Sequence, residues 1–258
     1  MPRWLSISSQ TARLRLVQLA GLTAFLVAWQ VVGSAATYLY STPVRVLGDL
    51  GALIFSGNLV SRTLFSLWTL AVGLTLSLVI GVTIGMLLGR FRLFAVIVEP
   101  YLAAFYSVPR IAFIPLLVIW FGIDRGFVVV TVVISAFVLI VFSTAAGVRE
   151  AGLAYFEVAR SFRISGWQMF MKILLPGSIP FIATGMRLAV QRGLVAVIIA
   201  EYIVGLPGLG KLLRDARVTE ATDRLFATAI ACMVLGIVLI MVTSSIERRL
   251  SRWRPQVF

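Results

Sequence analysis

The sequence predicts an all-α integral membrane protein with about six transmembrane helices. The chain has 258 residues, of which 60% are hydrophobic and 13% are charged, and its mean hydropathy is +1.02. These values exclude an ordinary soluble globular protein. Several apolar runs exceed the roughly 20 residues that a helix needs to cross about 30 Å of hydrocarbon. We therefore expect residues 1–258 to form one transmembrane domain.

Charge and residue usage narrow the function classes. In a membrane protein, a net charge of +13 indicates orientation and contact with anionic lipid headgroups, so we expect membrane lipid and no nucleic acid as a partner. Histidine is absent and Cys232 is the only cysteine. That composition excludes an intrachain disulfide, a histidine proton relay and a histidine/cysteine zinc site.

The first span is expected to be uncleaved. The polar, basic segment Met1–Arg15 precedes an apolar run that is long for a signal peptide and lacks a convincing cleavage site. The expected spans are Leu16–Tyr38, Leu64–Leu88, Pro100–Phe121 with an apolar lead-in from Leu93, Phe127–Gly147, Phe181–Val204 and Phe226–Ile246.

Two shorter features lie between these spans. Ser41–Asn58 has apolar residues at helical spacing, which predicts a short helix along the outer surface. Glu99-Pro100 is typical of a helix start, because proline at the first helical position lacks only an N–H that would have no partner there.

Glycines repeat along the second span. Gly81, Gly85 and Gly89 are four residues apart, with Gly73 further back. Small residues at this spacing form a groove that lets another helix approach closely. We expect tight helix packing here, and the alternative is that these glycines face lipid by chance.

The basic residues predict that both termini are cytoplasmic, because cytoplasmic segments carry an excess of Lys and Arg. With six spans, the inside segments then hold 13 basic residues against 7 outside. The inside set is Arg3, Arg13, Arg15, Arg90, Arg92, Arg149, Arg160, Arg163, Lys172, Arg248, Arg249, Arg252 and Arg254. The outside set is Arg45, Arg62, Arg125, Lys211, Arg214, Arg217 and Arg224.

The segment Arg149–Pro176 is a polar interruption between two apolar runs, and the topology places it inside. Its amphipathic rhythm predicts two short helices, Leu153–Phe162 and Gly166–Leu174, with a break at Ile164–Ser165. The segment is expected to dock a soluble partner, and the alternative is an interfacial loop that only links two spans. The apolar positions are Leu153, Phe156, Phe162, Trp167, Phe170 and Ile173, and the charged ones are Glu157, Arg160, Arg163 and Lys172.

This segment resembles the "EAA" loop of inner-membrane permeases of bacterial ATP-binding-cassette (ABC) importers. The family pattern is E-A-A, three residues, G, nine residues and I-x-L-P, and this chain matches it at Glu157, Ala159, Ile173, Leu175 and Pro176. It departs at Val158, which stands where the pattern has the alanine directly after the glutamate.

The glycine of the pattern is also displaced. Arg163 stands in its position, and Gly166 follows three residues later. A left-handed helix cap costs a non-glycine residue about 1 kcal/mol or more. Either the first loop helix runs on toward Gly166, or Arg163 caps it and contacts the ATPase directly.

The resemblance extends over residues 40–254. It is carried by Val108-Pro109-Arg110-Ile111-Ala112, Pro115-Leu116, Trp120-Phe121-Gly122, Ala146-Gly147-Val148-Arg149, Gly185-Met186-Arg187-Leu188, Glu201, Gly208-Leu209-Gly210 and Glu247-Arg248-Arg249-Leu250. These motifs are similar to those of the permeases for nitrate, sulfonates, taurine and thiamine-precursor compounds.

The resemblance implies a type I ABC importer permease in the bacterial inner membrane. Two copies of the chain would form the translocation path, two ATPase subunits would bind the loops at 149–176, and a periplasmic or lipid-anchored binding protein would deliver the substrate. ATP and Mg²⁺ would be bound by the ATPase, and this chain would need no cofactor. The residues expected to contact the ATPase or shape the loop are Glu157, Ala159, Arg160, Phe162, Arg163, Gly166, Trp167 and Pro176.

Charged residues inside the spans are the candidates for the path. Arg110 and Arg192 fall near the middle of the third and fifth spans, and Arg187 about one turn inside the fifth. An arginine at the bilayer centre costs around 2.5–3.5 kcal/mol on insertion scales, so each should face the protein interior or a wet cavity. Glu201 could pair with one of them. They either form structural ion pairs or line a path that favours an anionic or zwitterionic substrate.

A second motif is expected to be a coincidence. Gly205–Lys211 matches G-x-x-x-x-G-K, but Leu212 stands where a phosphate-binding loop has Ser or Thr. A membrane helix precedes it rather than a strand, so we expect a glycine-enabled turn.

Other classes of membrane protein fit the sequence less well. A purely structural protein would not need the polar loop or the arginines inside the spans. A secondary transporter would want an internal repeat and membrane carboxylates, whereas only Glu201 is acidic within the spans. A membrane enzyme would want histidine, reactive cysteine or clustered carboxylates. The sequence does not identify the substrate.

Overall fold

Every regular element in the described part of the chain is a helix. The computed structural model describes residues 4–35, 41–161 and 164–251, without the side chains of residues 153–163 and of most of the first fifteen. The helices are α1 (Trp4–Ala35), α2 (Pro43–Phe55), α3 (Asn58–Arg90), α4 (Arg92–Ser107), the 3-10 helix η1 (Arg110–Phe113), α5 (Ile114–Phe121), α6 (Arg125–Ser161), α7 (Gly166–Met169), the π-helix η2 (Phe170–Leu174), α8 (Leu175–Val204), α9 (Leu209–Val218) and α10 (Thr222–Leu250).

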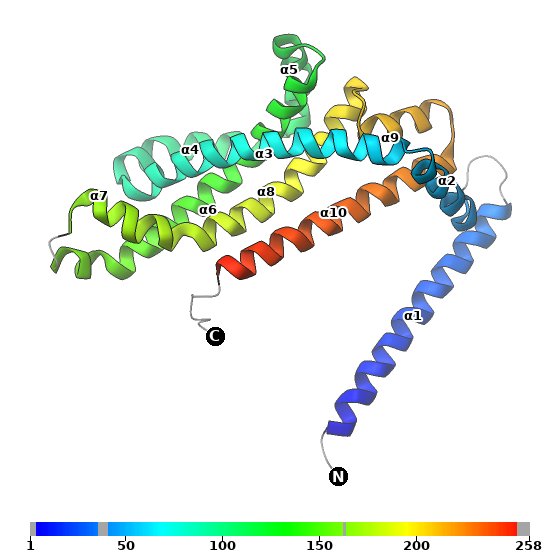
Figure 1. The fold of residues 1–258 in the computed structure, drawn as a ribbon, viewed down its shortest axis with the longest axis horizontal. Coiled ribbons are helices and arrows are strands. Elements are labelled where there is room, and N and C mark those ends of the chain that lie inside the picture. Colours follow the sequence, from blue (N-terminus) through cyan, green and yellow to red (C-terminus); the bar gives the residue numbers. More distant parts are fainter. Residues whose placement is uncertain (1–3, 36–40, 162–163, 252–258) are drawn as a thin grey trace.

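Five helical stretches are long and apolar enough to cross a membrane, and one bent pair would make a sixth span. The five begin in α1, α3, α6, α7 and α10, and the bent pair is α4 with η1–α5. Figure 1 shows α3, α6, α8 and α10 running alongside one another, with α7 at one end and α2 and α9 at the other. The expectation of about six spans is therefore confirmed.

The third span is not the straight helix Pro100–Phe121 that the sequence suggested. Two helical arms meet at 91°, because the chain is extended at Val108 and Pro109 (ψ 133° and 114°). Proline removes the N–H that a continuous helix would need there. The predicted helix start at Pro100 is also wrong, since Pro100 lies inside α4. The apolar lead-in is itself helical, and its Ala95 is buried with Leu88, Val141 and Ala145.

The expected loop helices are also continuous with their neighbours. The fourth span and the helix predicted at Leu153–Phe162 form one helix, α6, which is described as far as Ser161. Its end packs through Val148 and Ala151 against Met169 and Leu174 of the next hairpin arm. That arm passes through α7 and η2 into α8 without a break. Ile164 and Ser165 are non-helical, as expected.

The core is built around α6, which packs most extensively against α3 and α8. The glycines of α3 line this contact, because Cβ atoms added to them would fall on side chains of α6. An added Cβ at Gly81 would lie 2.7 Å from Cβ of Ile140, and one at Gly85 would lie 2.6 Å from Cβ of Thr144. Gly89 faces Val148 in the same way. These distances are shorter than packed carbon atoms tolerate. The two backbones can therefore approach this closely only because α3 has glycine, with no side chain, at these positions.

Candidate functional site

The broken third span, α6 and α8 together line a cavity of about 200 Å³ that is open on one side. Arg110 begins η1 directly after the break, and Arg192 comes from α8; both line this cavity. The structure therefore brings together two arginines that lie 82 positions apart (192 − 110) in the sequence. Thr131 and Ser135 of α6 add two buried hydroxyls, which sequence reasoning missed. The remaining lining residues are Pro109, Ile111, Ile114, Val195, Ala196 and Ile199.

Neither arginine of this cavity has a carboxylate partner among the described residues. The Arg110 guanidinium carbon lies 4.9 Å from the ring centroid of Tyr106, a cation–π contact. Arg192 is exposed in the single chain, and Arg110 is half-buried. A charge in a span that faces away from its own bundle must meet water or another subunit, since lipid solvates it poorly.

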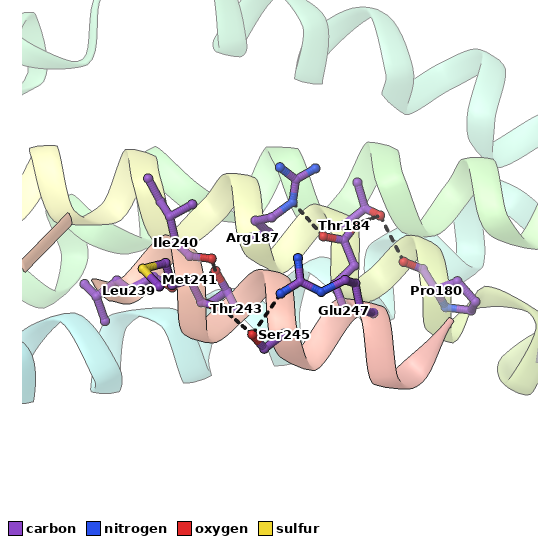
Figure 2. Close-up of polar contacts among 10 residues, drawn as sticks. Pro180, Thr184, Arg187, Leu239, Ile240, Met241, Thr243, Ser245 and Glu247 are labelled. Atoms are coloured by element: carbon purple, nitrogen blue, oxygen red, sulfur yellow. Dashed lines mark hydrogen bonds and ion pairs between the residues drawn. The ribbon is translucent and has the colours of Figure 1, made fainter. Parts of the chain in front are cut away.

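Arg187 lies elsewhere, in an ion pair between α8 and α10. Figure 2 shows its side chain pointing toward Glu247, whose carboxylate also accepts a hydrogen bond from Thr184. The distance from Nε of Arg187 to Oε2 of Glu247 is 2.7 Å, and that from Oγ1 of Thr184 to Oε1 is 2.6 Å. The Nε–H is not aligned for a hydrogen bond, so the contact with Arg187 is electrostatic. Sequence reasoning missed Glu247 as the partner.

Glu201 is not the partner of an arginine, contrary to the sequence-based suggestion. Its fully buried carboxylate accepts from the hydroxyl of Ser66 on α3 at 2.8–2.9 Å and from the N–H of Gly210 at 3.0 Å. The same hydroxyl oxygen accepts from the N–H of Leu209 at 3.0 Å. Glu201 thus holds the beginning of α9 against α3 and α8.

This network also explains the glycine-rich stretch before Lys211. Gly205 has a left-handed φ of 79° and ends α8, so the expected glycine-enabled turn exists at that residue. The expectation is wrong beyond it, because Leu209–Lys211 belong to α9, a helix that was not predicted. The first amides of α9 already donate to Glu201 and Ser66, which leaves them unavailable to a phosphate.

The interruption at 149–176 forms the tip of the α6–α8 hairpin. Ser165 begins α7 with a capping box, in which its hydroxyl accepts from the N–H of Gln168 at 3.3 Å and its own N–H donates to the Gln168 side chain at 3.2 Å. Trp167 is 68% exposed and stacks on Phe170 with ring centroids 5.9 Å apart. A Cβ atom added at Gly166 would meet no other atom within 4 Å.

The other residues of the loop pattern are placed only in part. Glu157, Ala159 and Arg160 lie in the last turns of α6, and their side chains are outside the described part of the chain. Phe162 and Arg163 lie outside the described residues. Pro176 is the second residue of α8 and follows directly after the π-helix η2. No group of three carboxylate or thiol side chains able to hold a metal occurs in the described ranges.

Comparison with known proteins identifies the fold and the family. Residues 78–254 match the family described as binding-protein-dependent transport system inner membrane component. The chain belongs to this family. The permease is 32% identical to the putative aliphatic sulfonates transport permease protein SsuC of Bacillus subtilis over 90% of this chain and 86% of that protein. It is 27% identical to the bicarbonate transport system permease protein CmpB of Synechococcus elongatus over 92% and 90%, and 28% identical to the taurine transport system permease protein TauC of Escherichia coli over 74% and 70%.

Solved structures show the same fold. The permease superposes on a chain of the MetNI methionine ABC transporter with a TM-score of 0.66 at 19% identity, covering 75% of this chain and 96% of the other. A chain of an amino acid ABC transporter gives a TM-score of 0.64 at 16% identity, covering 78% and 97%. The permease thus has the fold of a type I ABC importer membrane subunit.

Family membership settles the class of activity. The permease is the membrane subunit of an ATP-driven importer of the bacterial inner membrane, and it works with a separate ATPase and a solute-binding protein. It is not itself the catalyst of ATP hydrolysis. The secondary-transporter alternative is not supported.

Proposed function

We propose that two copies of the permease form the translocation path for a small anionic or zwitterionic solute. The observation that carries this proposal is the cavity with Arg110 and Arg192, which lies at a face of the single chain and has no counter-ion among the described residues. A second copy packed on that face would exclude lipid from the cavity, so that a water-filled path could form between the two copies. The relatives named for sulfonates, taurine and bicarbonate all handle solutes with an acidic group.

The first helix supports the same assembly. Its span Leu16–Ala35 is apolar, yet only 6% of its most apolar window is buried within the chain, and Figure 1 shows α1 standing apart from the long helices. Lipid covers such a surface in part, and a neighbouring copy would cover more of it. The single chain therefore presents surfaces suited to a homodimer that binds two ATPase subunits, one on each coupling segment.

The segment 149–176 is proposed as the site where ATPase closure moves the permease. The tip is tied to the path because α6 supplies Thr131 and Ser135, and α8 supplies Arg192. Both helices continue into the tip without interruption. A displacement of the tip therefore shifts two walls of the cavity, which is how ATP binding can bias a two-state membrane domain.

Co-purification with the ATPase tests this function. We expect the partner ATPase to remain bound to the wild type and to be lost from Glu157→Lys, because the substitution reverses a charge at the proposed contact. Glu220→Lys is the matched control, since it makes the same change in the turn between α9 and α10, at the other end of the bundle. Uptake that follows an ion gradient and needs no ATPase would overturn the proposal.

A further inference from the structure

We infer that the cavity formed by Arg110, Arg192, Thr131 and Ser135 is an anion-binding site that prefers a net-negative solute to a zwitterion. This inference rests on the proposed function, which left both kinds of substrate open. It assigns the substrate selectivity of the permease to a defined place between the break in the third span, α6 and α8.

The lining of the cavity is rich in hydrogen-bond donors. Two guanidinium groups supply forked donors that match the planar geometry of carboxylate or sulfonate oxygens. The hydroxyl of Ser135 makes no hydrogen bond within the described residues, so it is free to donate as well. Ser135 is 3% exposed, which places this donor inside the protein. An acidic group would find at least three donors here.

The acceptors of the cavity are few. No Asp or Glu in the part of the chain that the structure describes lines it. The hydroxyl of Thr131 donates to the carbonyl of Phe127 at 2.8 Å, so only its oxygen remains as an acceptor. An ammonium group would therefore lose its hydration, find only the neutral hydroxyl oxygens of Thr131 and Ser135 as side-chain acceptors, and lie beside two positive charges. Desolvation and like-charge repulsion both disfavour it.

The acidic residues of the neighbouring helices are engaged elsewhere. Glu201 is held by Ser66 and Gly210, and Glu247 by Arg187 and Thr184. Asp124 accepts from the N–H of Phe127 at 3.0 Å at the beginning of α6. None of them lines the cavity, so these carboxylates do not neutralise its positive charge.

A matched set of probes tests the preference. Ethanesulfonate, taurine and ethyl methyl sulfone are similar in size; taurine adds an ammonium group to ethanesulfonate, and the sulfone removes the negative charge. Their binding to the full-length permease, purified with its ATPase, is measured by ligand-induced thermal shift at constant ionic strength. We expect ethanesulfonate to bind about tenfold or more tightly than taurine, and the sulfone not to bind over the same range.

Substitutions locate the binding. Arg110→Gln and Arg192→Gln should each weaken ethanesulfonate binding by about tenfold or more, because each removes a charge-assisted hydrogen-bond donor. Arg45→Gln is the control, since it removes one arginine from the exposed face of α2. Ser135→Asp places a carboxylate in the cavity and should reverse the preference in favour of taurine.

The outcomes separate this inference from the proposed function. Equal affinity for taurine and ethanesulfonate, unchanged binding in both arginine variants, or no anion binding to the wild type would overturn the anion site. Each of these results could occur while the ATPase still binds to the wild type and is lost from Glu157→Lys. Failure of that co-purification would instead overturn the importer assembly itself.

Discussion

Glu201 illustrates how a single residue can join three elements of a membrane protein. A carboxylate buried in a span is costly unless it is hydrogen-bonded, and this one accepts from a hydroxyl on α3 and an amide on α9. The N-terminus of α9 carries a partial positive charge that favours a nearby anion. The residue therefore fixes α9 against α3 and α8 and has no direct part in the cavity.

The first prediction concerns Ser66, which shares this network. Ser66→Ala removes the donor to Glu201 and leaves the N–H of Leu209 without its partner. We expect a loss of about 1–3 kcal/mol of local stability, seen as faster amide hydrogen exchange at the beginning of α9. Ser61→Ala is the control on the same helix, because that hydroxyl only donates to the carbonyl of Asn58. Equal protection of α9 in the two variants would contradict the prediction.

A second residue-scale prediction concerns the contact between α3 and α6. Gly81→Ala would place a methyl group 2.7 Å from Cβ of Ile140, so we expect destabilisation of about 1–3 kcal/mol from overpacking. Gly21→Ala is the control, because nothing lies within 4 Å of that position, and alanine there should be neutral or slightly stabilising. The measurement is the free energy of unfolding in lipid or detergent. A Gly81 variant as stable as the control would show that the helices can separate at no cost.

At the scale of elements, α8 connects the parts of the molecule. It carries Arg192 into the cavity, Arg187 into the ion pair with α10 and Glu201 into the network with α3 and α9. These three contacts join α8 to different parts of the molecule, and its N-terminal end continues from α7 and η2 at the tip. A movement of α8 would therefore be transmitted to the cavity, to α10 and to the opposite end of the bundle.

The third prediction is a double-mutant cycle on the ion pair between α8 and α10. We expect a coupling of about 1 kcal/mol or more in unfolding free energy between Arg187→Gln and Glu247→Gln. This value is lower than for a fully buried pair, because the two side chains are 33% and 20% exposed. The Lys211–Asp215 pair is the comparison cycle, since it lies within one helix and is more exposed; about 0.3–0.5 kcal/mol is expected there. A coupling near zero for Arg187 and Glu247 would mean that the pair does not tie the helices together.

At the scale of the whole molecule, the two ends of the bundle differ in role. Figure 1 places α7 at one end and α2 with α9 at the other. The excess of basic residues at the α7 end predicts that this end is cytoplasmic. The ATPase would then act at one end, while the solute-binding protein would dock over α2 and α9.

The fourth prediction tests this orientation by cysteine labelling in a Cys232→Ser background. Ser56→Cys, in the exposed turn between α2 and α3, should react with an impermeant thiol reagent added outside. Gly166→Cys, exposed at the tip, should react only after the membrane is opened. Labelling of both positions from the same side would contradict the topology. Bound ATPase should protect the cysteine at position 166 and leave that at position 56 reactive.

Several features of the permease were determined by the sequence alone. Hydropathy over successive residues predicts helices and spans, because a backbone in lipid must satisfy its hydrogen bonds locally. The amphipathic pattern also predicted the break at Ile164–Ser165, which the structure confirms. The residues of the loop pattern were identified by resemblance to the family, and their role stays a prediction. The predicted helix boundaries were less accurate. The helix α6 continues past Gly147 because its end packs against α7 and η2, and a local sequence pattern contains no information about such tertiary contacts.

Only the tertiary structure decided which charged side chains meet. In the sequence, the charged residues of the fifth span cannot be told apart by their surroundings. In the structure, Arg187 is paired with α10, Arg192 lines the cavity and Glu201 anchors α9. Their partners Glu247 and Ser66 lie 60 (247 − 187) and 135 positions away. Local hydropathy and helix periodicity are set by neighbouring residues, whereas ion pairs and cavities depend on how helices rotate and pack against one another. The glycines of α3 link the sequence pattern to the tertiary packing, because their spacing is visible in the sequence and determines how closely α6 can approach.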